Sequence, residues 1–354
     1  MNVHKFMLGD LIEQYDEINS AEEFSDIDDL QGINSNKYFQ ECKSNKNDID
    51  LFRYRICRHG MFSYNKATSR NGEKISIALR TGKDCLVSPS YYCFSIKDEN
   101  ILSPKYLDIW FRRPIFDKYA RFNSWGSATE FFTFDDFCAT EIMLPTLDEQ
   151  LRIVHEYQVI TDRIALLNRL NEKLLCLAHT LYCQYVDAED KTDWHMGTVS
   201  ELLTVKYGKD HSLLSDGDVP LYGSGGLMRY VERPLYNKVS VLIPRKGTLN
   251  NIMYVDDPFW SVDTMFYTEI KNDKMAKYIY FFLKGIDFNG LNTGSAVPST
   301  SSEVINSLQL WIPDNRSIAE FDNTLTPIFA RIKVNKTECR KLENLRNLIT
   351  LSMS

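Results

Sequence analysis

The residues that could perform chemistry are scattered along the chain. Its six histidines and eight cysteines form no Cys-x-x-Cys pair and show no spacing typical of metal ligands. No Gly-x-Ser-x-Gly elbow is present, and no cysteine is paired with a histidine in a recognisable signature. The cysteines therefore indicate reduced core thiols rather than a disulfide framework or a zinc site. We predict a chain without a catalytic or metal site, which is not an enzyme by itself.

Two short motifs have features of cofactor sites but lack residues that such sites need. The glycine loop Tyr222–Gly226 has no Gly-Lys-Ser/Thr and does not fit Gly-x-Gly-x-x-Gly, so we interpret it as a tight loop that brings backbone close to a ligand, with an anion nest as the alternative. The segment 257–260, Asp-Pro-Phe-Trp, resembles the Asx-Pro-Pro-aromatic motif of amino-methyltransferases. Its second proline is missing, and no glycine-rich cofactor loop follows a strand upstream. A methyltransferase with a fused recognition domain stays an alternative that cofactor binding by the isolated chain would support.

Charge is distributed unevenly in the first half of the chain. Residues 58–83 contain six Lys or Arg against the single Glu73, interleaved with aromatic and small polar residues. This window is either a solvated hairpin or a region that contacts phosphates and base edges. Residues 16–29 contain seven acids and no Lys or Arg, as in a solvated face or a patch for a partner. The net charge of −7 argues against indiscriminate nucleic-acid binding but permits a local basic surface.

These residues must be positioned by elements around one long helix. Residues 148–186 contain no Pro or Gly, and mostly apolar residues recur there in alternating steps of three and four. That spacing is typical of a helix that packs along a partner helix, and Asp148 is the expected cap after Pro145. The predicted seam consists of Ile153, Tyr157, Ile160, Ile164, Leu167, Asn171, Leu174, Ala178, Leu181 and Tyr185.

An internal repeat supplies the partner helix. Gly-Ser-Ala at 126–128 recurs at 294–296, and the Leu-Pro of 144–145 recurs as the Ile-Pro of 312–313, both offset by 168 residues. Applied to the first seam, this offset predicts a second one at Phe321, Leu325, Ile328, Ile332, Asn335, Cys339, Leu342, Arg346, Ile349 and Met353. The chain is thus a tandem duplication of a domain followed by a long helix. Antiparallel packing would relate the halves by a pseudo-dyad, with Asn171 and Asn335 fixing the register or lying in a frayed seam.

The expected fold is α+β. Two mixed α/β domains are separated by two long antiparallel helices that form a coiled coil, with a pseudo-two-fold internal repeat. We place the first domain at residues 1–147, the first helix at 148–186, the second domain at 187–316 and the second helix at 317–354. No apolar run reaches the roughly 18 to 20 residues that span a bilayer. The first residues also lack a secretion signal, so the expected location is the cytoplasm.

Several strings together with this arrangement resemble the specificity subunit of type I restriction–modification systems. They are PLYGSGG at 220–226, IPRKGT at 243–248, FWSVDT at 259–264, TGSAVPST at 293–300, Gly-Ser-Ala at 126–128 and LPTLDEQ at 144–150. The last string, in which Pro145 precedes Glu149 and Gln150, resembles the proline and Glu-Gln with which the family's long helix begins. The second repeat reads IPDNRS at 312–317 without Glu-Gln, which predicts a weaker cap on the second helix.

The resemblance implies two target-recognition domains that each read one half of a bipartite DNA target. The helices would act as a ruler for the spacer and as a docking site for modification subunits. The resemblance also implies a non-catalytic chain that assembles with double-stranded DNA, two modification (methyltransferase) subunits and restriction subunits. S-adenosylmethionine, ATP and Mg would belong to those partners, with no cofactor in this chain. A non-DNA coiled-coil scaffold holding two ligand-binding domains is the alternative, favoured if neither domain has a positive concave face.

Composition and loop position suggest the DNA-binding residues. Lys and Arg would contact phosphates, while Asn, Ser, Thr and Arg would read groove edges. In the first domain they are Arg58, Lys66, Arg70, Asn71, Lys74, Arg80, Trp125 and Ser127. In the second they are Tyr222, Ser224, Arg229, Arg245, Lys246, Asn250, Asn251, Thr293 and Ser295. The sequence leaves open the target bases, the spacer length and whether a restriction subunit exists.

Overall fold

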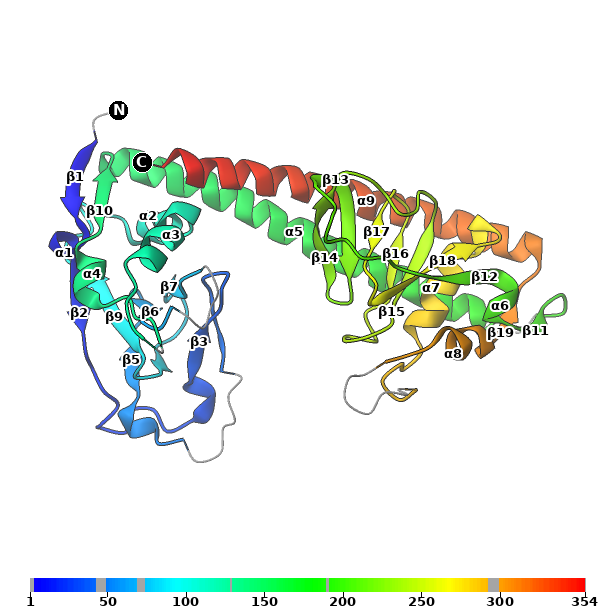
Figure 1. Ribbon diagram of the computed structural model, residues 1–354, viewed down its shortest axis with the longest axis horizontal. Coiled ribbons are helices and arrows are strands. Elements are labelled where there is room, and N and C mark those ends of the chain that lie inside the picture. The colour runs from blue at the N-terminus through cyan, green and yellow to red at the C-terminus, as the bar shows by residue number, and fades with distance from the viewer. Residues whose placement is uncertain are drawn as a thin grey trace. The chain divides into compact units, whose positions relative to one another are not determined.

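The computed structural model describes residues 3–42, 49–68, 74–127, 129–188, 191–291 and 299–353. The chain divides into two compact units (Figure 1). Unit 1 comprises Met1–Leu166 and Glu338–Ser354, and unit 2 comprises Leu167–Thr337. Each unit combines an α+β domain with segments of two long helices, which confirms the predicted α+β class and the packing of the long helices.

Unit 1 is built on a four-stranded antiparallel sheet with strand order β2-β9-β6-β7. The pairs β1–β10, β3–β4 and β5–β8 form three smaller antiparallel sheets. The strands are β1 (His4–Met7), β2 (Ile12–Tyr15), β3 (Gln31–Ile33), β4 (Phe39–Glu41), β5 (Arg55–Cys57), β6 (Phe62–Asn65), β7 (Ile77–Leu79), β8 (Cys85–Val87), β9 (Tyr91–Ile96) and β10 (Glu141–Leu144). The short helices are α1 (Leu8–Leu11), α2 (Pro104–Phe111), α3 (Pro114–Phe122) and α4 (Phe134–Cys138).

Unit 2 repeats the four-stranded main sheet and the strand pair next to the long helices. Its main sheet has the order β12-β18-β15-β16, a second sheet has the order β14-β13-β17, and β11 pairs with β19. The strands are β11 (His195–Thr198), β12 (Leu203–Tyr207), β13 (Asp216–Gly223), β14 (Gly226–Val231), β15 (Ser240–Pro244), β16 (Met253–Val255), β17 (Trp260–Ser261), β18 (Met265–Ile270) and β19 (Gln309–Ile312). The helices are α6 (Val199–Leu202), α7 (Ala276–Lys284) and α8 (Ser302–Ser307).

The offset between equivalent elements changes along the repeat. The β1-α1-β2 segment beginning at His4 matches β11-α6-β12 beginning at His195, an offset of 191 residues. At the other end, β10 begins at Glu141 and β19 at Gln309, an offset of 168. The residues between these two segments are therefore fewer in unit 2 than in unit 1.

The two long helices are α5 (Leu147–Val186) and α9 (Asn315–Ser352). At the start of α5, the hydroxyl of Thr146 accepts the amide of Glu149 at 3.4 Å, so Thr146 takes the position predicted for Asp148. At the start of α9, Asp314 accepts the amides of Arg316 and Ser317 at 2.8 and 3.1 Å. The prediction of a weaker second cap is therefore wrong, because a carboxylate replaces the hydroxyl at the equivalent position.

Gln150, from the string LPTLDEQ, ties the start of α5 to the domain. Its side chain is buried, accepts the amide of Ser103 at 2.9 Å, and donates to the carbonyls of Ile101 and Pro145 at 2.9 and 3.0 Å. The equivalent residue in α9 is Ile318, which is fully buried in an apolar cluster. The same position is thus held by hydrogen bonds in one unit and by apolar burial in the other.

Within each unit the two helices pack antiparallel. In unit 1, Arg163 donates to Glu338 at 2.8 Å, and the guanidinium of Arg346 lies 5.9 Å from the ring centre of Tyr157. In unit 2, Tyr185 stacks on Phe321 with ring centres 4.4 Å apart, and Asn335 donates to Asn171 at 2.8 Å. In both units, residues later in α5 contact residues earlier in α9, which is the arrangement of an antiparallel pair. All the predicted seam residues are buried or half-buried.

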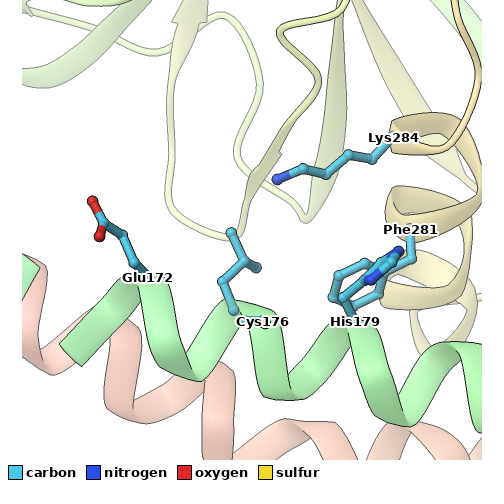
Figure 2. A pocket seen from close by; sticks show the side chains of 6 residues that line it. Glu172, Cys176, His179, Phe281 and Lys284 are labelled. Atoms are coloured by element: carbon cyan, nitrogen blue, oxygen red, sulfur yellow. The ribbon is translucent and has the colours of Figure 1, made fainter. Parts of the chain in front are cut away.

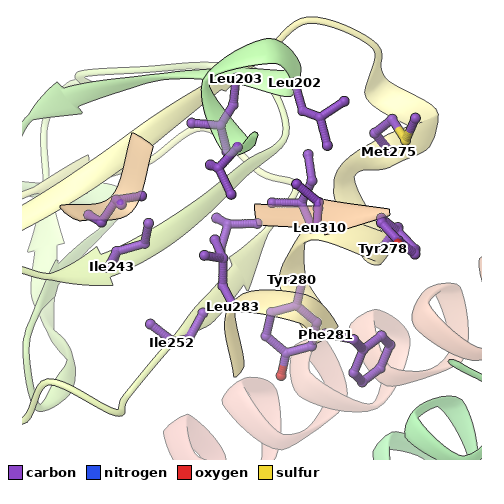
Figure 3. Packing of buried hydrophobic residues seen from close by; sticks show 14 of the residues in the cluster. Leu202, Leu203, Ile243, Ile252, Met275, Tyr278, Tyr280, Phe281, Leu283 and Leu310 are labelled. Carbon is purple, nitrogen blue, oxygen red and sulfur yellow. The ribbon is translucent and has the colours of Figure 1, made fainter. Parts of the chain in front are cut away.

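Apolar cores join the helices to both domains. In unit 1, Phe62, Phe94, Phe111 and Phe137 pack together in one apolar cluster. The cluster also contains Tyr157 of α5 and Met353, which directly follows α9. In unit 2, Tyr278, Tyr280 and Phe281 of α7 pack with Leu202, Leu283 and Leu310 (Figure 3). That cluster also contains residues of both long helices. Within the described residues, no helix has the length and apolar character to cross a membrane.

Candidate nucleic-acid interface

Three loop segments of unit 2 come together beside the β13–β14 hairpin. Asn251 donates from Nδ2 to the carbonyl of Ser224 at the hairpin tip, at 2.8 Å. Lys246 forms a β-bridge with Ser299, and the amide of Thr300 donates to the carbonyl of Arg245 at 3.1 Å. The strings PLYGSGG and IPRKGT, which are far apart in sequence, therefore lie in contact, and TGSAVPST ends beside them.

Gly247 allows this close approach. Its φ of +86° lies in the left-handed region that disfavours other residues, and a Cβ placed there would lie 2.8 Å from Oγ of Ser224. The glycine in IPRKGT is therefore required by backbone conformation and by contact with the hairpin tip.

The predicted DNA-binding side chains of this cluster differ in how strongly the protein holds them. Lys246 is exposed. Arg245 lies 5.4 Å from the ring centre of Tyr207 and donates to the carbonyl of Asp263 at 3.1 Å. Asn250 donates to Asp287 at 3.0 Å and accepts a backbone amide. Lys246 is thus the side chain best presented for a phosphate, while Asn250 is engaged in holding its loop.

Arg229 and Tyr222 on the hairpin strands are anchored. Arg229 forms an ion pair with Asp216 at 2.9 Å and donates to the carbonyls of His211 and Leu214, each at 3.0 Å. Burial raises the pKa of Tyr222 to about 12, and its ring packs edge-on against Phe259. We interpret both as residues that shape the hairpin.

Unit 1 has an equivalent loop pairing. Ala67 bridges Phe131, as Lys246 bridges Ser299 in unit 2, and Phe131 and Ser299 are related by the 168-residue offset. The amide of Thr68 donates to the carbonyl of Glu130 at 3.0 Å, and the amide of Phe132 donates to that of Lys66 at 2.9 Å. The segment after the first Gly-Ser-Ala is therefore paired with residues 66–68, in the middle of the basic window.

An exposed tryptophan projects from this pairing. Trp125 and Phe131 exchange two backbone hydrogen bonds, at 3.0 and 2.9 Å, yet the Trp125 side chain is 70% exposed. Phe122, at the end of α3, is 80% exposed. Exposed aromatics on a rigid backbone beside cations are suited to contact with bases or sugars. Ser127, also predicted, is exposed in the same loop.

The other predicted cations of unit 1 have different environments. Lys74 is exposed, and Lys66 is half-buried with its ammonium 5.6 Å from the ring centre of Tyr92. Arg80 lies 5.0 Å from the ring centre of Phe39 and donates to the carbonyl of Lys83. Arg70, Asn71, Thr293 and Ser295 lie outside the described residues.

Arg58 is neutralised by acids from the stretch 16–29 and from a later loop. It donates to Glu17 at 3.1 Å, to Glu23 at 2.8 Å and to Asp84 at 3.1 Å. Hydrogen bonding to Arg58 lowers the pKa of Glu23. The His59 amide, and then the Arg58 guanidinium, lower the pKa of Asp84. A cation with three carboxylate partners has little charge left for phosphate, so the structure gives Arg58 a structural role.

The sequence reading missed the unit 1 counterpart of the glycine-rich hairpin. The tip of β3–β4 spans residues 34–38, Asn-Ser-Asn-Lys-Tyr, and Lys37 has a φ of +64°. The tip of β13–β14 has a positive φ at the same place, at Gly226. Because residues 34–38 contain no glycine, they do not resemble PLYGSGG. The Asn-Ser-Asn turn between two short alternating stretches was the available signal.

A further hollow in unit 2 lies between α5 and α7. It has a volume of about 410 Å³ and is lined by Glu172, Leu175, Cys176, His179, Phe281 and Lys284 (Figure 2). The residues that the structure describes contain no cluster of His, Cys, Asp and Glu able to hold a metal. The converging loops therefore stay the candidate site in each unit.

The sequence matches the family described as the type I restriction modification DNA specificity domain, over residues 19–175 and again over 191–344. These two regions span most of the chain. The chain belongs to this family. Family members are non-catalytic DNA specificity subunits of type I restriction–modification complexes, and they recognise target DNA and assemble with the other subunits. The resemblance of the strings is confirmed, and the scaffold and methyltransferase alternatives are removed.

Structural comparison supports the family's fold. The chain is similar to a type I S subunit from M. genitalium, with 16% identity, a TM-score of 0.58, and coverage of 99% of this chain and 95% of the other. An HsdS subunit from Thermoanaerobacter tengcongensis shares 15% identity at a TM-score of 0.38, with coverage of 98% and 95%. A search of the curated proteins finds no match.

Proposed function

We propose that this specificity subunit reads a bipartite DNA target, with one half read by each unit. The observation that carries the proposal is the repetition of one loop arrangement. Phe131 in unit 1 and Ser299 in unit 2 each lie five residues after the glycine of Gly-Ser-Ala. Each forms a β-bridge with the loop that follows an inner strand of the main sheet, β6 in unit 1 and β15 in unit 2. Matching frames with different loop sequences suit two related but different half-sites.

Different side chains have different roles in this proposal. Lys66, Lys74 and Lys246 contact phosphates and set position, with Arg245 and Arg80 held beside them. Ser224, Ser127 and Trp125 approach base edges or sugars, while Asn250, Asn251, Tyr222 and Arg229 shape the loops. Arg58 is structural. Arg70, Asn71, Thr293 and Ser295 stay proposed contacts because of their positions in the loop strings.

The long helices provide the spacer and the docking sites in this proposal. The domains correspond to residues 1–147 and 187–316, and the helices to 148–186 and 317–354. The partners are double-stranded DNA, two modification subunits and restriction subunits. The methyltransferase partners bring S-adenosylmethionine, and the restriction partners bring ATP and Mg. The complex works in the cytoplasm, where the DNA is.

A charge-removal experiment tests the DNA surface. The chain is assembled with its modification subunits, and duplex binding is measured by fluorescence anisotropy from about 50 to 200 mM salt. Lys246→Ala should weaken binding and reduce the slope of log affinity against log salt by about one unit. The matched control is Lys206→Ala on the edge strand β12, whose ammonium lies 3.5 Å from Glu269. Equal slopes for Lys246→Ala and the unchanged chain would show that the assigned surface is wrong.

A further inference from the structure

We infer that the β3–β4 hairpin tip, residues 34–38, reads bases in the half-site of unit 1, with Ser35 and Asn36 as the specificity-determining side chains. This inference rests on the proposed function and extends it to residues that the PLYGSGG string does not reveal.

The hairpins β3–β4 and β13–β14 occupy the same place in the two units. Leu30, just before β3, bridges Leu86 of β8 in parallel, and Leu221 of β13 pairs with Trp260 of β17 in parallel. Both β8 and β17 are followed in sequence by the second strand of the main sheet, β9 or β18. The first strand of each hairpin therefore lies against equivalent strands.

The two tips also have matching turns. In unit 1 the turn runs over residues 34–37, with the Lys37 amide donating to the Asn34 carbonyl at 2.9 Å. In unit 2 the turn runs over residues 223–226, since Gly223 pairs with Gly226. The fourth residue of each turn has a positive φ, at Lys37 and Gly226. Ser35 is thus the counterpart of Ser224, and Asn36 the counterpart of Gly225.

Lys37 holds the tip rigidly. Its side chain is 4% exposed, and its ammonium forms an ion pair with Asp117 at 2.7 Å while also donating to the Phe111 carbonyl. Arg112 adds hydrogen bonds to the carbonyls of Asn36 and Lys37, at 3.1 and 3.0 Å. A lysine that tolerates a strained φ to reach a buried carboxylate acts as a positioning residue.

The same carboxylate joins the tip to the basic window. Asp117 Oδ1 also accepts the amide of Ile75 at 3.1 Å, next to the exposed Lys74. In unit 2 the equivalent junction is the direct bond from Asn251 to the Ser224 carbonyl. Both tips therefore lie beside the loop that follows the central strand of the main sheet.

The tip presents chemistry suited to base edges. The side chains of Ser35 and Asn36 are exposed, whereas Asn34 is engaged in accepting the amides of Asn36 and Tyr38 at 3.0 and 3.2 Å. An asparagine amide can pair with both N6 and N7 of adenine, and serine can donate or accept. A preorganised turn that exposes the side-chain amide of Asn36 is suited to hydrogen bonds with base edges rather than to phosphate binding.

The test uses the full chain expressed with its modification subunits, and methylated sites are mapped across the host genome. Ser35→Ala/Asn36→Ala should relax or change one half of the methylated sequence, and should leave the other half and the spacing intact. Ser224→Ala, the counterpart in unit 2, should alter the opposite half. If Ser35→Ala/Asn36→Ala leaves both halves unchanged, or alters the same half as Ser224→Ala, the inference is wrong.

Two further readouts cover the remaining outcomes. If Ser35→Ala/Asn36→Ala abolishes methylation, fluorescence anisotropy measures the affinity of the variant for the DNA target of the unchanged chain. Roughly tenfold weaker binding at an unchanged melting temperature supports the inference. Equal affinity overturns it. Should the double variant fail to fold, Asn36→Asp alone replaces it, and it should change the base read or weaken target binding by a similar factor. If the unchanged chain gives no bipartite sequence, the proposed function fails instead of this inference.

Discussion

Arg58 and Lys246 differ in how far the protein has already neutralised their charges. Arg58 sits in the basic window of the sequence, but Glu17, Glu23 and Asp84 surround its guanidinium. Lys246 is exposed in a loop whose backbone is fixed by a β-bridge. The net charge of a sequence window therefore does not identify the cations that can bind phosphate, because acidic residues from distant parts of the sequence can form ion pairs with them.

The Arg58 cluster predicts acid sensitivity in unit 1. The pKa values of Glu23 and Asp84 are lowered in the folded state, so their stabilising contribution is present above the ordinary carboxyl values of about 4 to 4.5 and is lost as the pH falls through the lower folded values. Arg58→Met should flatten the fall in melting temperature between about pH 5 and 3, and should lower the melting temperature at pH 7.

The matched control for that experiment is Arg53→Met. Arg53 is exposed and, among the residues that the structure describes, forms its ion pair with Asp50, at 3.0 Å. Surface pairs of this kind contribute little, roughly 0 to 1 kcal/mol. If both variants change the pH profile of the melting temperature equally, the Arg58 cluster has no special role in stability.

A second prediction at the residue scale concerns Gly247. Gly247→Ala should destabilise unit 2 by about 1–2 kcal/mol, because a Cβ there meets Ser224 and the left-handed conformation is strained. Gly225→Ala is the control, since a Cβ at Gly225 has nothing within 4 Å. Urea unfolding of both variants measures the difference. Equal midpoints would contradict the steric role of Gly247.

Among the elements, the long helices were the most predictable from sequence. The 168-residue offset matches the starts of β10 and β19 and of α5 and α9. Heptad spacing identified the seam, because an antiparallel helix pair buries the same stripe over its whole length. The cap residues were harder to predict. Thr146 and Asp314 occupy equivalent positions but differ in chemistry, and the sequence reading selected Asp148.

The loops that we propose to contact DNA were less predictable than the helices. Strings such as PLYGSGG point to a hairpin because glycine marks its turn, but its counterpart in unit 1 replaces Gly226 with Lys37. Only the ion pair between Lys37 and Asp117, which are 80 residues apart, explains why a lysine tolerates that turn. Contacts of this kind depend on tertiary packing and leave no local pattern in the sequence.

The pair Asn171 and Asn335 gives a prediction for the helices. Asn335 is fully buried, and its Oδ1 has no hydrogen-bond partner among the described residues, while its Nδ2 donates to Asn171 at 2.8 Å. Asn335→Leu alone leaves Asn171 unpaired and should cost about 1–2 kcal/mol. Replacing both with Leu should recover that loss or exceed it, as polar seam residues fix register at the expense of stability.

A double-mutant cycle measures this coupling. Chemical unfolding of the unchanged chain, both single Leu variants and the double variant yields the interaction free energy. A coupling close to zero would show that the two amides do not act as a pair in solution.

At the scale of the whole molecule, the chain carries one loop arrangement twice and pairs two long helices antiparallel within each unit. The family match covers both halves of the repeat, over residues 19–175 and 191–344. Each half of the repeat contains one candidate DNA surface and one long helix, and each compact unit contains a segment of both helices. A protein built in this way should specify two short base sequences separated by a constant number of unread base pairs.

The most direct test is a genome-wide map of methylated bases in cells that express this chain with its modification subunits, compared with cells that express the modification subunits alone. The account predicts a new methylated sequence in two parts with a fixed spacer, which appears only when the chain is present. A single uninterrupted sequence, or methylation that does not depend on the chain, would contradict it.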